Sequence, residues 1–250
     1  MEDKQILLVD SGNSRLKWAL YRHYLVPGPA FASRPLREEA LDALWGALAA
    51  PARVLIANVA GKEVAEVLCA FIRSRWSLEP EFVRSQASGF GVVSGYLEPK
   101  TLGVDRWLGL VAARNRYFLP SLIADCGTAL TLDVIDEAGR HKGGLICPGL
   151  KLMAETLVHQ TSGIRLAEGS GFGSLGDSTS AAVHLGARQA ALGVIERTFR
   201  RQQKLHPKLS LLLTGGDAEA LLPELEVQAH WVPDLVLEGL AVISRGEGER

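Results

Sequence analysis

Two segments of this chain, one at its start and one near its middle, repeat the same arrangement of residues. Each is an apolar run followed by an aspartate, a small residue, a glycine and a short polar residue: Ile6-Leu7-Leu8-Val9-Asp10-Ser11-Gly12-Asn13 and Ser121-Leu122-Ile123-Ala124-Asp125-Cys126-Gly127-Thr128. A second strand-like stretch follows each segment, at residues 16–20 and 130–135. A buried strand that ends in an aspartate and turns at a glycine presents a carboxylate together with backbone N–H groups, which suits a metal-bound polyphosphate.

The repetition carries this argument, because aspartate and glycine occur in any hairpin turn and one copy would indicate only a turn. Two similar hairpins in the two halves of a chain indicate an ancestral duplication. We therefore expect a nucleotide to bind in a cleft between the two halves.

The composition is ordinary for a soluble globular protein and excludes several classes of partner. Hydrophobic residues make up 47% and charged residues 22% of the 250 residues, enough for one large domain or two smaller ones. The formal net charge is −1, so we expect no binding to nucleic acid or to a membrane surface. The chain has neither a signal-peptide pattern nor the run of about 18 apolar residues that a membrane span needs.

The cysteines and histidines do not have the spacing of a metal site. Cys69, Cys126 and Cys147 form no CxxC or CxxH pattern, which argues against both zinc and a disulfide framework. We expect reduced thiols in a cytoplasmic protein, with Cys126 and Cys147 as small buried residues rather than nucleophiles. The six histidines form no HExxH or HxH pair, and we interpret all of them as ordinary surface or helix residues: His23, His141, His159, His184, His206 and His230.

The hydrophobic pattern alternates strands with helices, as in α/β domains. It predicts helices at 36–49, 62–76, 105–118, 178–203, 217–222 and 232–244, and strands at 53–59 and 209–213. The helix at 105–118 ends before Pro120, and we place a domain boundary there. The predicted domains are 1–118 and 119–250, and the last helix is a candidate to pack back across the first domain.

An acid and a base stand side by side in Gly103-Val104-Asp105-Arg106, at a predicted helix start. One interpretation is structural: Asp105 caps the helix and Arg106 points to solvent. The other is chemical. Asp105 would act as a general base on a substrate hydroxyl, and Arg106 would hold a carboxylate or phosphate.

Three glycine-rich segments allow either a turn or a ligand. Leu213-Thr214-Gly215-Gly216-Asp217 lies between a strand and a helix, where an anion or a planar group could approach the backbone, and 143–149 is similar. The segment 171–176 matches GxGxxG, but the polar residues 161–170 before it are no buried strand, so we favour a surface loop over a dinucleotide site. The chain has no Walker GxxxxGK[ST] loop.

Five segments in this order and spacing resemble type III pantothenate kinase over nearly the whole chain. They are DSGNSRLKW (10–18), GYLEPKTLGVDRW (95–107), DCGTALTLD (125–133), GGLICPG (143–149) and LTGGD (213–217). The resemblance implies an α/β fold of two duplicated ribonuclease H-like (actin-like ATPase) domains with the nucleotide cleft between them. It also implies transfer of phosphate from ATP to the primary hydroxyl of pantothenate, the first step toward coenzyme A. Mg²⁺, a monovalent cation (K⁺ or NH₄⁺) and a homodimer are further implications.

The resemblance also assigns roles to individual residues. Asp105 would be the proton acceptor, and Asp10 and Asp125 would face metal ions, Asp125 as the ligand of the monovalent cation. The remaining nucleotide-binding residues would be Ser11, Gly12, Asn13, Ser14, Arg15, Leu16, Lys17, Gly127 and Thr128, with Gly215, Gly216 and Asp217 near the adenosine. Pantothenate would contact Tyr96, Gly103, Val104, Asp105, Arg106 and Thr179.

One segment departs from the family pattern, and two other functions stay open. Between Ile164 and Ser178 the family usually has a proline-containing stretch that ends in Asn-Thr, whereas this chain is Gly- and Ser-rich and ends in Ser178-Thr179. A non-catalytic accessory factor of transcription could share this fold, although it would not need Asp10, Asp105, Asp125 and Arg106 together. A kinase for another small hydroxy acid is the second alternative, because phosphoryl-transfer groups do not define the acceptor.

Overall fold

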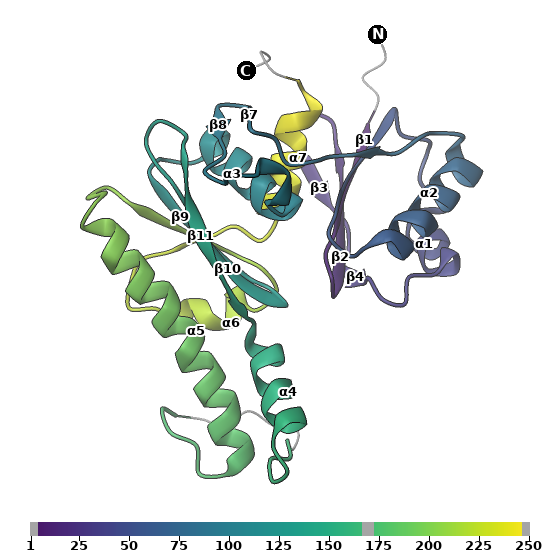
Figure 1. Ribbon diagram of the computed structural model, residues 1–250. Helices are drawn as coiled ribbons and strands as arrows, with labels where there is room; N and C mark the ends of the chain where they lie inside the picture. The colour runs from purple at the N-terminus through teal and green to yellow at the C-terminus, as the bar shows by residue number, and fades with distance from the viewer. Residues whose placement is uncertain (1–4, 167–172, 247–250) are drawn as a thin grey trace. The chain divides into compact units, whose positions relative to one another are not determined.

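The computed structural model describes residues 5–166 and 173–246, which form two compact units (Figure 1). Among these residues, unit 1 consists of 5–117 and 234–246, and unit 2 of 118–166 and 173–233. The chain thus passes from unit 1 to unit 2 after Tyr117 and returns after Pro233.

Unit 1 is built on a mixed sheet in the order β3-β2-β1-β5-β6, with β4 also pairing with β2. The strands are β1 (Ile6–Ser11), β2 (Arg15–Tyr21), β3 (Leu25–Pro27), β4 (Phe31–Ala32), β5 (Arg53–Asn58) and β6 (Glu81–Phe82). β1 runs antiparallel to β2 and parallel to β5. The first predicted hairpin is therefore confirmed, and it lies at the centre of the sheet.

Helices α1 (Glu38–Trp45) and α2 (Lys62–Trp76) cover one face of this sheet. Leu7 and Val9 alternate along β1 and point into the core with them, as a strand with one buried face requires. The core contains an aromatic cluster of Trp18, Trp45, Phe71 and Trp76, whose neighbouring ring centroids are 5.9 to 6.4 Å apart. Each such aromatic pair contributes about 0.5–1.5 kcal/mol beyond its buried area.

The other helices of unit 1 are α3 (Val104–Arg116) and α7 (Leu235–Ser244), which pack against each other. α7 also contacts β1, β2 and β5, and α3 contacts β5. Gly239 allows the close approach, because a Cβ there would lie 2.3 Å from the Leu108 carbonyl oxygen. A short hairpin, β7 (Ser88–Gly89) with β8 (Val92–Val93), and the turn η1 (Pro99–Thr101) precede α3.

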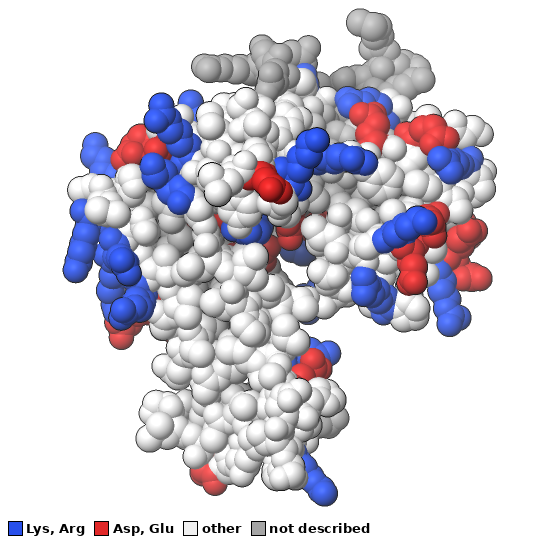
Figure 2. Space-filling model, in the orientation of Figure 1, with Lys and Arg blue, Asp and Glu red and all other residues white. Residues whose placement is uncertain are grey.

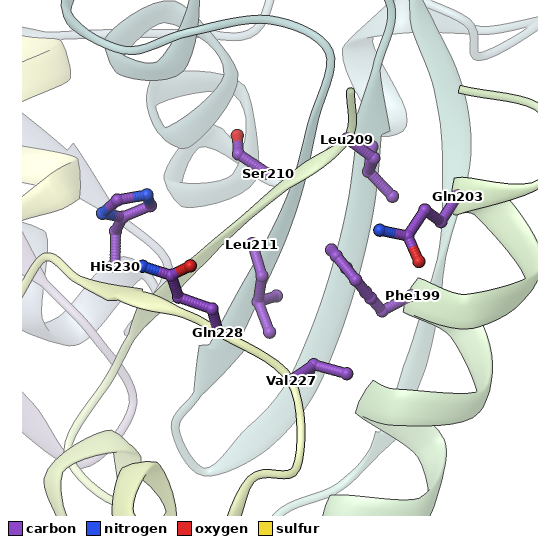
Figure 3. Close-up of a pocket in the computed structure, with 8 residues that line it drawn as sticks. All are labelled: Phe199, Gln203, Leu209, Ser210, Leu211, Val227, Gln228 and His230. Carbon is purple, nitrogen blue, oxygen red and sulfur yellow. The ribbon is translucent and has the colours of Figure 1, made fainter. Parts of the chain in front are cut away.

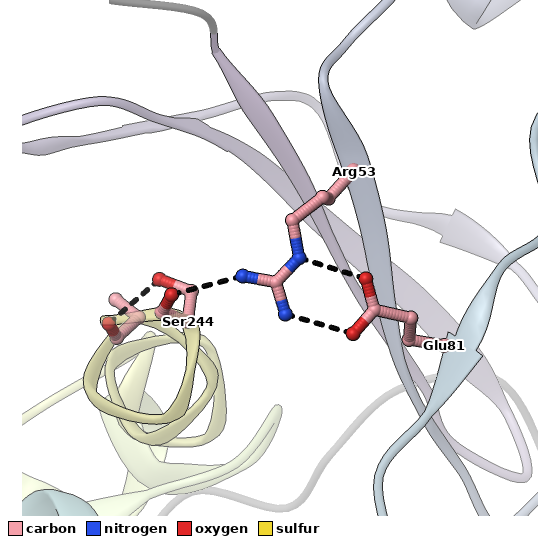
Figure 4. A network of polar contacts seen from close by, with 4 residues as sticks. Arg53, Glu81 and Ser244 are labelled. Carbon is pink, nitrogen blue, oxygen red and sulfur yellow. Dashed lines mark hydrogen bonds and ion pairs between the residues drawn. The ribbon is translucent and has the colours of Figure 1, made fainter. Parts of the chain in front are cut away.

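Polar contacts hold both ends of α7 within unit 1. Near its start, the Tyr117 hydroxyl donates to Glu238 at 2.9 Å. At its end, Arg53 donates to the Ser244 carbonyl at 3.0 Å and pairs through two nitrogens with Glu81, each at 2.7 Å (Figure 4). A guanidinium at a helix C-terminus satisfies a carbonyl that has no partner within the helix.

Unit 2 repeats the same sheet order as β11-β10-β9-β12-β13. The strands are β9 (Ser121–Cys126), β10 (Ala129–Ile135), β11 (His141–Pro148), β12 (Ser210–Thr214) and β13 (His230–Trp231). β9 is antiparallel to β10 and parallel to β12, as β1 is to β2 and β5. The second hairpin and the duplication of the sheet are thereby confirmed.

The helices of unit 2 pack on one face of its sheet. They are α4 (Leu150–Gln160), α5 (Thr179–Gln203), α6 (Ala218–Leu221) and the turn η2 (Leu222–Glu224). The core under them contains alternate residues of the strands: Leu122, Ala124 and Cys126 of β9, Leu130, Leu132 and Val134 of β10, and Leu211 and Leu213 of β12. The residues between them, including Asp125, Thr131 and Thr214, consequently point to the opposite face.

Most predicted helices and strands are present with small shifts of their ends, and α2 has the predicted bounds. We did not predict α4, although Leu150, Met153, Ala154, Leu157 and Val158 have helical spacing after Pro148-Gly149. Part of the GxGxxG match lies outside the described residues, and its described part, 173–176, lies outside helices and strands. In the described parts of the chain, no helix is long and apolar enough to cross a membrane.

The interpretation of His141 as a surface or helix residue was wrong. His141 lies in β11, is 3% exposed, and its Nε2 is 2.8 Å from Asp133 Oδ1. The pairing of β10 with β11 shifts between Asp133 and Ile135, which brings the two side chains to the same buried face. A histidine between Arg140 and Lys142 has no local sign of burial, so only the strand pairing determines it.

Candidate active site

The first hairpin turns tightly between β1 and β2. The Gly12 N–H donates to the Arg15 carbonyl at 3.0 Å, and Asn13, Ser14 and Arg15 are exposed at the turn. Asp10 lies directly opposite Lys17, and both are half-buried. Because Leu7 and Val9 fill the core under α1 and α2, Asp10 points to the other face, the one on which α7 packs.

Two residues predicted at the nucleotide have side chains inside unit 1. Ser11 and Leu16 are opposite each other in the β1–β2 pair, and both are 0% exposed. Leu16 belongs to the core under α1 and α2. Any contact of these two residues with a ligand would therefore have to come from the backbone.

The second hairpin collects most of the predicted residues of unit 2. The Gly127 N–H donates to the Ala129 carbonyl at 3.2 Å, which leaves Thr128 exposed at the turn. α4 begins against this turn: the Gly149 N–H donates to the Thr128 carbonyl at 2.9 Å, and a Cβ at Gly149 would lie 2.1 Å from the Gly127 oxygen. Only a glycine permits that approach.

The Gly215-Gly216-Asp217 segment folds onto the same hairpin. The Asp217 N–H donates to the Cys126 carbonyl at 2.9 Å. Gly215 has a φ of 94°, in the region that favours glycine, and a Cβ there would lie 2.4 Å from Asp125 Oδ1. The segment Gly215–Asp217 is therefore a turn whose backbone lies against the Asp125 carboxylate.

The prediction that Cys126 is a buried, unreactive thiol agrees with its surroundings. Its side chain is 3% exposed, and burial, followed by the charges of Asp125 and Asp217, raises its pKa to about 12. A thiol with that pKa is almost entirely protonated at neutral pH and is a poor nucleophile. Cys147 packs on the same core but is only partly buried.

The start of α3 brings Asp105, Arg106 and Tyr96 together. Asp105 Oδ1 accepts the Arg106 backbone N–H at 2.8 Å. The Arg106 side chain is 8% exposed, donates to the Tyr96 hydroxyl at 2.7 Å, and has its guanidinium carbon 5.4 Å from the centre of the Tyr96 ring. Asp105 is not the helix cap, since that position is Gly103, and Arg106 does not point to solvent. The structural interpretation of this motif is therefore wrong in both of its parts.

Gly103 determines where the Asp105 carboxylate can lie. A Cβ at Gly103 would be 2.5 Å from Asp105 Oδ1, closer than a carbon and an oxygen can approach. Val104 is the first residue of α3. Thr179 is the first residue of α5 in unit 2, is exposed, and follows Ser178, whose hydroxyl caps the helix by accepting the Ala181 N–H at 3.2 Å.

A cavity of about 350 Å³ lies in unit 2, between the end of α5, the strand β12 and the segment before β13 (Figure 3). Its lining has no carboxylate, lysine or arginine and comprises Phe199, Gln203, Leu209, Ser210, Leu211, Val227, Gln228 and His230. It lies at the amino end of β12, whereas Gly215–Asp217 follow the carboxyl end. None of the residues predicted at the active site lines it.

The positions of the histidine, cysteine and acidic side chains bear on where a metal ion could bind. Among the described residues, no three or more His, Cys, Asp or Glu side chains gather into a metal-binding group. Mg²⁺ commonly binds to nucleotides through one or two carboxylates together with phosphates and water, and Asp10 at the end of β1 fits that role.

The repeated sheets and hairpins define the class of the protein as an actin-like ATPase or sugar-kinase fold. A Campylobacter jejuni protein assigned to the Baf family of transcriptional activators superposes with a TM-score of 0.61 at 19% identity, over 97% of this chain and all of that chain. The activator of 2-hydroxyisocaproyl-CoA dehydratase from Clostridium difficile, solved with ADPNP, has a TM-score of 0.53 at 12% identity, over 98% of each chain. At such identities these likenesses show the fold alone.

Sequence comparison identifies the family. The profile of the type III pantothenate kinase family matches residues 6–201. The type III pantothenate kinase of Nitrosococcus oceani is 40% identical over 249 residues, which covers 96% of this chain and 94% of that protein. That of Nitrosomonas eutropha is 36% identical over 246 residues, with coverage of 96% and 94%. The chain belongs to the type III pantothenate kinase family.

Proposed function

We propose that this protein transfers the γ-phosphate of ATP to the primary hydroxyl of pantothenate, the first step of coenzyme A biosynthesis. Membership of the family supports the substrate pair. The single structural observation that carries the proposal is the start of α3, where the Asp105 carboxylate lies beside a buried arginine held by Tyr96. The residue that we assign as the general base, Asp105, is therefore the neighbour of the residue that we assign to anion binding, Arg106.

In this mechanism the Asp105 carboxylate accepts the proton of the attacking hydroxyl, as a positioned base does in other kinases. Arg106 binds the carboxylate of pantothenate, and its fork-shaped guanidinium is well suited to that geometry. Tyr96 keeps the guanidinium oriented through its hydroxyl and its ring face. We also assign contacts with pantothenate to the backbone of Gly103 and Val104 and to Thr179.

The two hairpins serve the nucleotide. We assign Asp10 to Mg²⁺, the backbone of residues 11–16 and Lys17 to the phosphates, and Gly127 and Thr128 to the phosphates from unit 2. We assign the segment Gly215–Asp217, which rests on the second hairpin, to the adenosine. Mg²⁺, when bound, supplies charge neutralisation on the phosphates. Asp125 is the ligand of a monovalent cation.

A coupled assay that records ADP formation tests the proposal, with and without pantothenate, together with mass detection of 4′-phosphopantothenate. Asp105→Asn keeps the size of the side chain but removes its basicity. We expect turnover to fall by about 10²–10⁴, the usual contribution of a positioned base, with an unchanged circular dichroism spectrum. Wild-type turnover in the folded variant would remove Asp105 from the mechanism.

The alternatives have their own outcomes in the same assay. A kinase for another acceptor would consume ATP with other small hydroxy acids and not with pantothenate. An accessory factor without catalysis would show no pantothenate-dependent ADP under any condition. The family membership does not favour this last interpretation, although the Campylobacter jejuni structure shares the fold.

We also propose a homodimer in a reducing compartment, the cytoplasm. The edge strand β11 exposes Leu145 and Ile146, 48% and 63% accessible, and α4 exposes Leu152 and Leu157, each 41%. On the face seen in Figure 2, the part of unit 2 around α4 and the start of α5 shows few charged side chains. An apolar edge of this kind is normally covered, and a second copy would cover it.

The cysteines support the second part of this proposal. The three cysteines are free thiols, as the reducing cytoplasm requires.

A further inference from the structure

The two copies of the hairpin aspartate have different neighbours in their sheets. Asp10 on β1 pairs with Lys17 on β2 and with Ala57 on β5. Asp125 on β9 pairs with Thr131 on β10 and with Thr214 on β12. Directly paired residues on adjacent strands point to the same face of the sheet, and in an antiparallel pair their Cβ atoms are about 4.5–5.5 Å apart. Each aspartate is thus the middle member of a row of three residues across its sheet. The first row is Lys17, Asp10 and Ala57, and the second row is Thr131, Asp125 and Thr214.

The second row faces away from the core of unit 2. The residues before and after each member belong to that core, namely Ala124 and Cys126, Leu130 and Leu132, and Leu213. The Asp125 carboxylate leans toward the end of β12, because a Cβ at Gly215 would lie 2.4 Å from its Oδ1. Asp125 and Thr131 are half-buried, and Thr214 is 4% exposed. Three oxygen-bearing side chains thus share one small, partly dehydrated area.

The chemistry of this row differs from that of its copy. In unit 1 the residue beside the aspartate brings its own ammonium group, that of Lys17. In unit 2 the corresponding position, Thr131, brings a neutral hydroxyl. One carboxylate flanked by two neutral oxygens has a charge of −1 and only hard oxygen donors, which fits a monovalent cation. The donor set therefore fits the cation assigned to Asp125.

We propose that Thr131 and Thr214 complete the monovalent-cation site with Asp125, and that the bound cation takes the place that the Lys17 ammonium has in the first copy. This inference rests on the proposed function, because it concerns the cation of that reaction. It adds two residues to the site and a reason for the cation: the second hairpin has a threonine where the first has a lysine. It also predicts that a lysine introduced at position 131 makes the external cation unnecessary.

The experiment uses the full chain and four variants: Thr131→Val, Thr214→Val, Thr131→Lys and Thr198→Val. Valine keeps the shape of threonine without its hydroxyl. Thr198 is a half-buried threonine of α5, which packs on the other face of the sheet, so its variant is the matched control. The thermal midpoint is measured with MgATP against KCl, with choline chloride holding the ionic strength constant, and pantothenate phosphorylation is measured in the same series.

The wild type and Thr198→Val should show a midpoint that rises with K⁺. In Thr131→Val and Thr214→Val, the K⁺ concentration for half the effect should increase by about tenfold or more, as for lost metal-site partners. In Thr131→Lys the midpoint should be the same in both salts, and the ratio of rates in K⁺ and choline should be close to one.

Two results would overturn the inference while leaving the kinase intact. One is pantothenate phosphorylation whose K⁺ dependence is unchanged in both valine variants. The other is phosphorylation by the wild type that is equal in K⁺ and choline, with no K⁺-dependent midpoint. Failure of the proposed function is distinct from both, since the wild type would then form no 4′-phosphopantothenate in any salt.

Discussion

At the scale of single residues, the start of α3 shows how one glycine can determine the position of a neighbouring carboxylate. Asp105 lies in the first turn of the helix, and its Oδ1 accepts the N–H of the next residue. This orientation is open only because Gly103 has no side chain. The residues of the motif are therefore linked by space as well as by charge, and in the mechanism that we propose Gly103 acts on the reaction through Asp105.

Gly103→Ala should consequently impair chemistry more than ATP binding. Its Cβ would occupy a position 2.5 Å from Asp105 Oδ1, so the carboxylate must move. A misplacement of about 1 Å costs on the order of 10² in rate, and we expect kcat to fall by about that factor, with the KM for ATP nearly unchanged. Gly186→Ala, on α5 with no atom within 4 Å of its added Cβ, is the matched control. An equal loss in both variants would contradict the role of Gly103.

At the scale of elements, α7 is the segment that returns from unit 2 to pack within unit 1. Its acidic residue Glu238 is partly buried, accepts the Tyr117 hydroxyl, and lies 3.9 Å from Arg116. Burial raises the pKa of Glu238 above its ordinary value of 4.5, and the contacts with Tyr117 and Arg116 oppose that rise. Burial also raises the pKa of Tyr117. The free energy of unfolding therefore depends on pH through Glu238, a residue of α7.

The direction of this pH dependence follows from the raised pKa of Glu238. Because the folded pKa of Glu238 exceeds the unfolded one, its contribution to stability is present below the unfolded pKa and is lost as pH rises through the folded pKa. Glu238→Gln should have a free energy of unfolding close to that of the wild type at pH 4. Above the raised pKa, at pH 8, the variant should gain stability relative to the wild type. Urea unfolding at both pH values measures the difference, and a variant that is relatively less stable at pH 8 would reverse the assignment.

At the scale of the whole molecule, the two similar sheets differ in the residue that lies beside the repeated aspartate. The same strand order carries a lysine beside the aspartate in unit 1 and a threonine in unit 2. The units also differ at their edges. β3, in unit 1, has only three residues, whereas β11, in unit 2, has eight and exposes apolar side chains. A long apolar edge is a surface that favours pairing.

Ile146→Lys should therefore give a monomer. A charge at this position of β11, where the side chain is 63% exposed, is costly to bury against a second copy but does not disturb the fold. Light scattering after size exclusion should give about twice 26.9 kDa for the wild type and 26.9 kDa for the variant. Leu205→Lys, 70% exposed just after α5, should stay dimeric. A wild type that is already monomeric, or an Ile146→Lys dimer, would exclude β11 as the interface.

Local features of the chain were sufficient to predict the hairpins, the alternation of strands and helices, and the family. Apolar alternation and a glycine turn act over a few residues, so β1–β2 and β9–β10 could be derived from 6–20 and 121–135. α4 had a helical pattern that we did not use. These features depend on neighbours in the sequence, which is why the sequence by itself determines them.

Only the tertiary structure decided which side chains meet. Arg106 is buried against Tyr96, ten positions earlier, and His141 against Asp133 across a shifted strand pair. Thr131 and Thr214 flank Asp125 because β10 and β12 pair with β9 in one register, and 83 residues separate the two threonines. A register shift of one residue would turn the strand residues among them, Asp133, His141, Thr131 and Thr214, to the other face of the sheet. Such contacts depend on strand order and pairing, which are properties of the whole fold and leave no trace in any short stretch of the sequence.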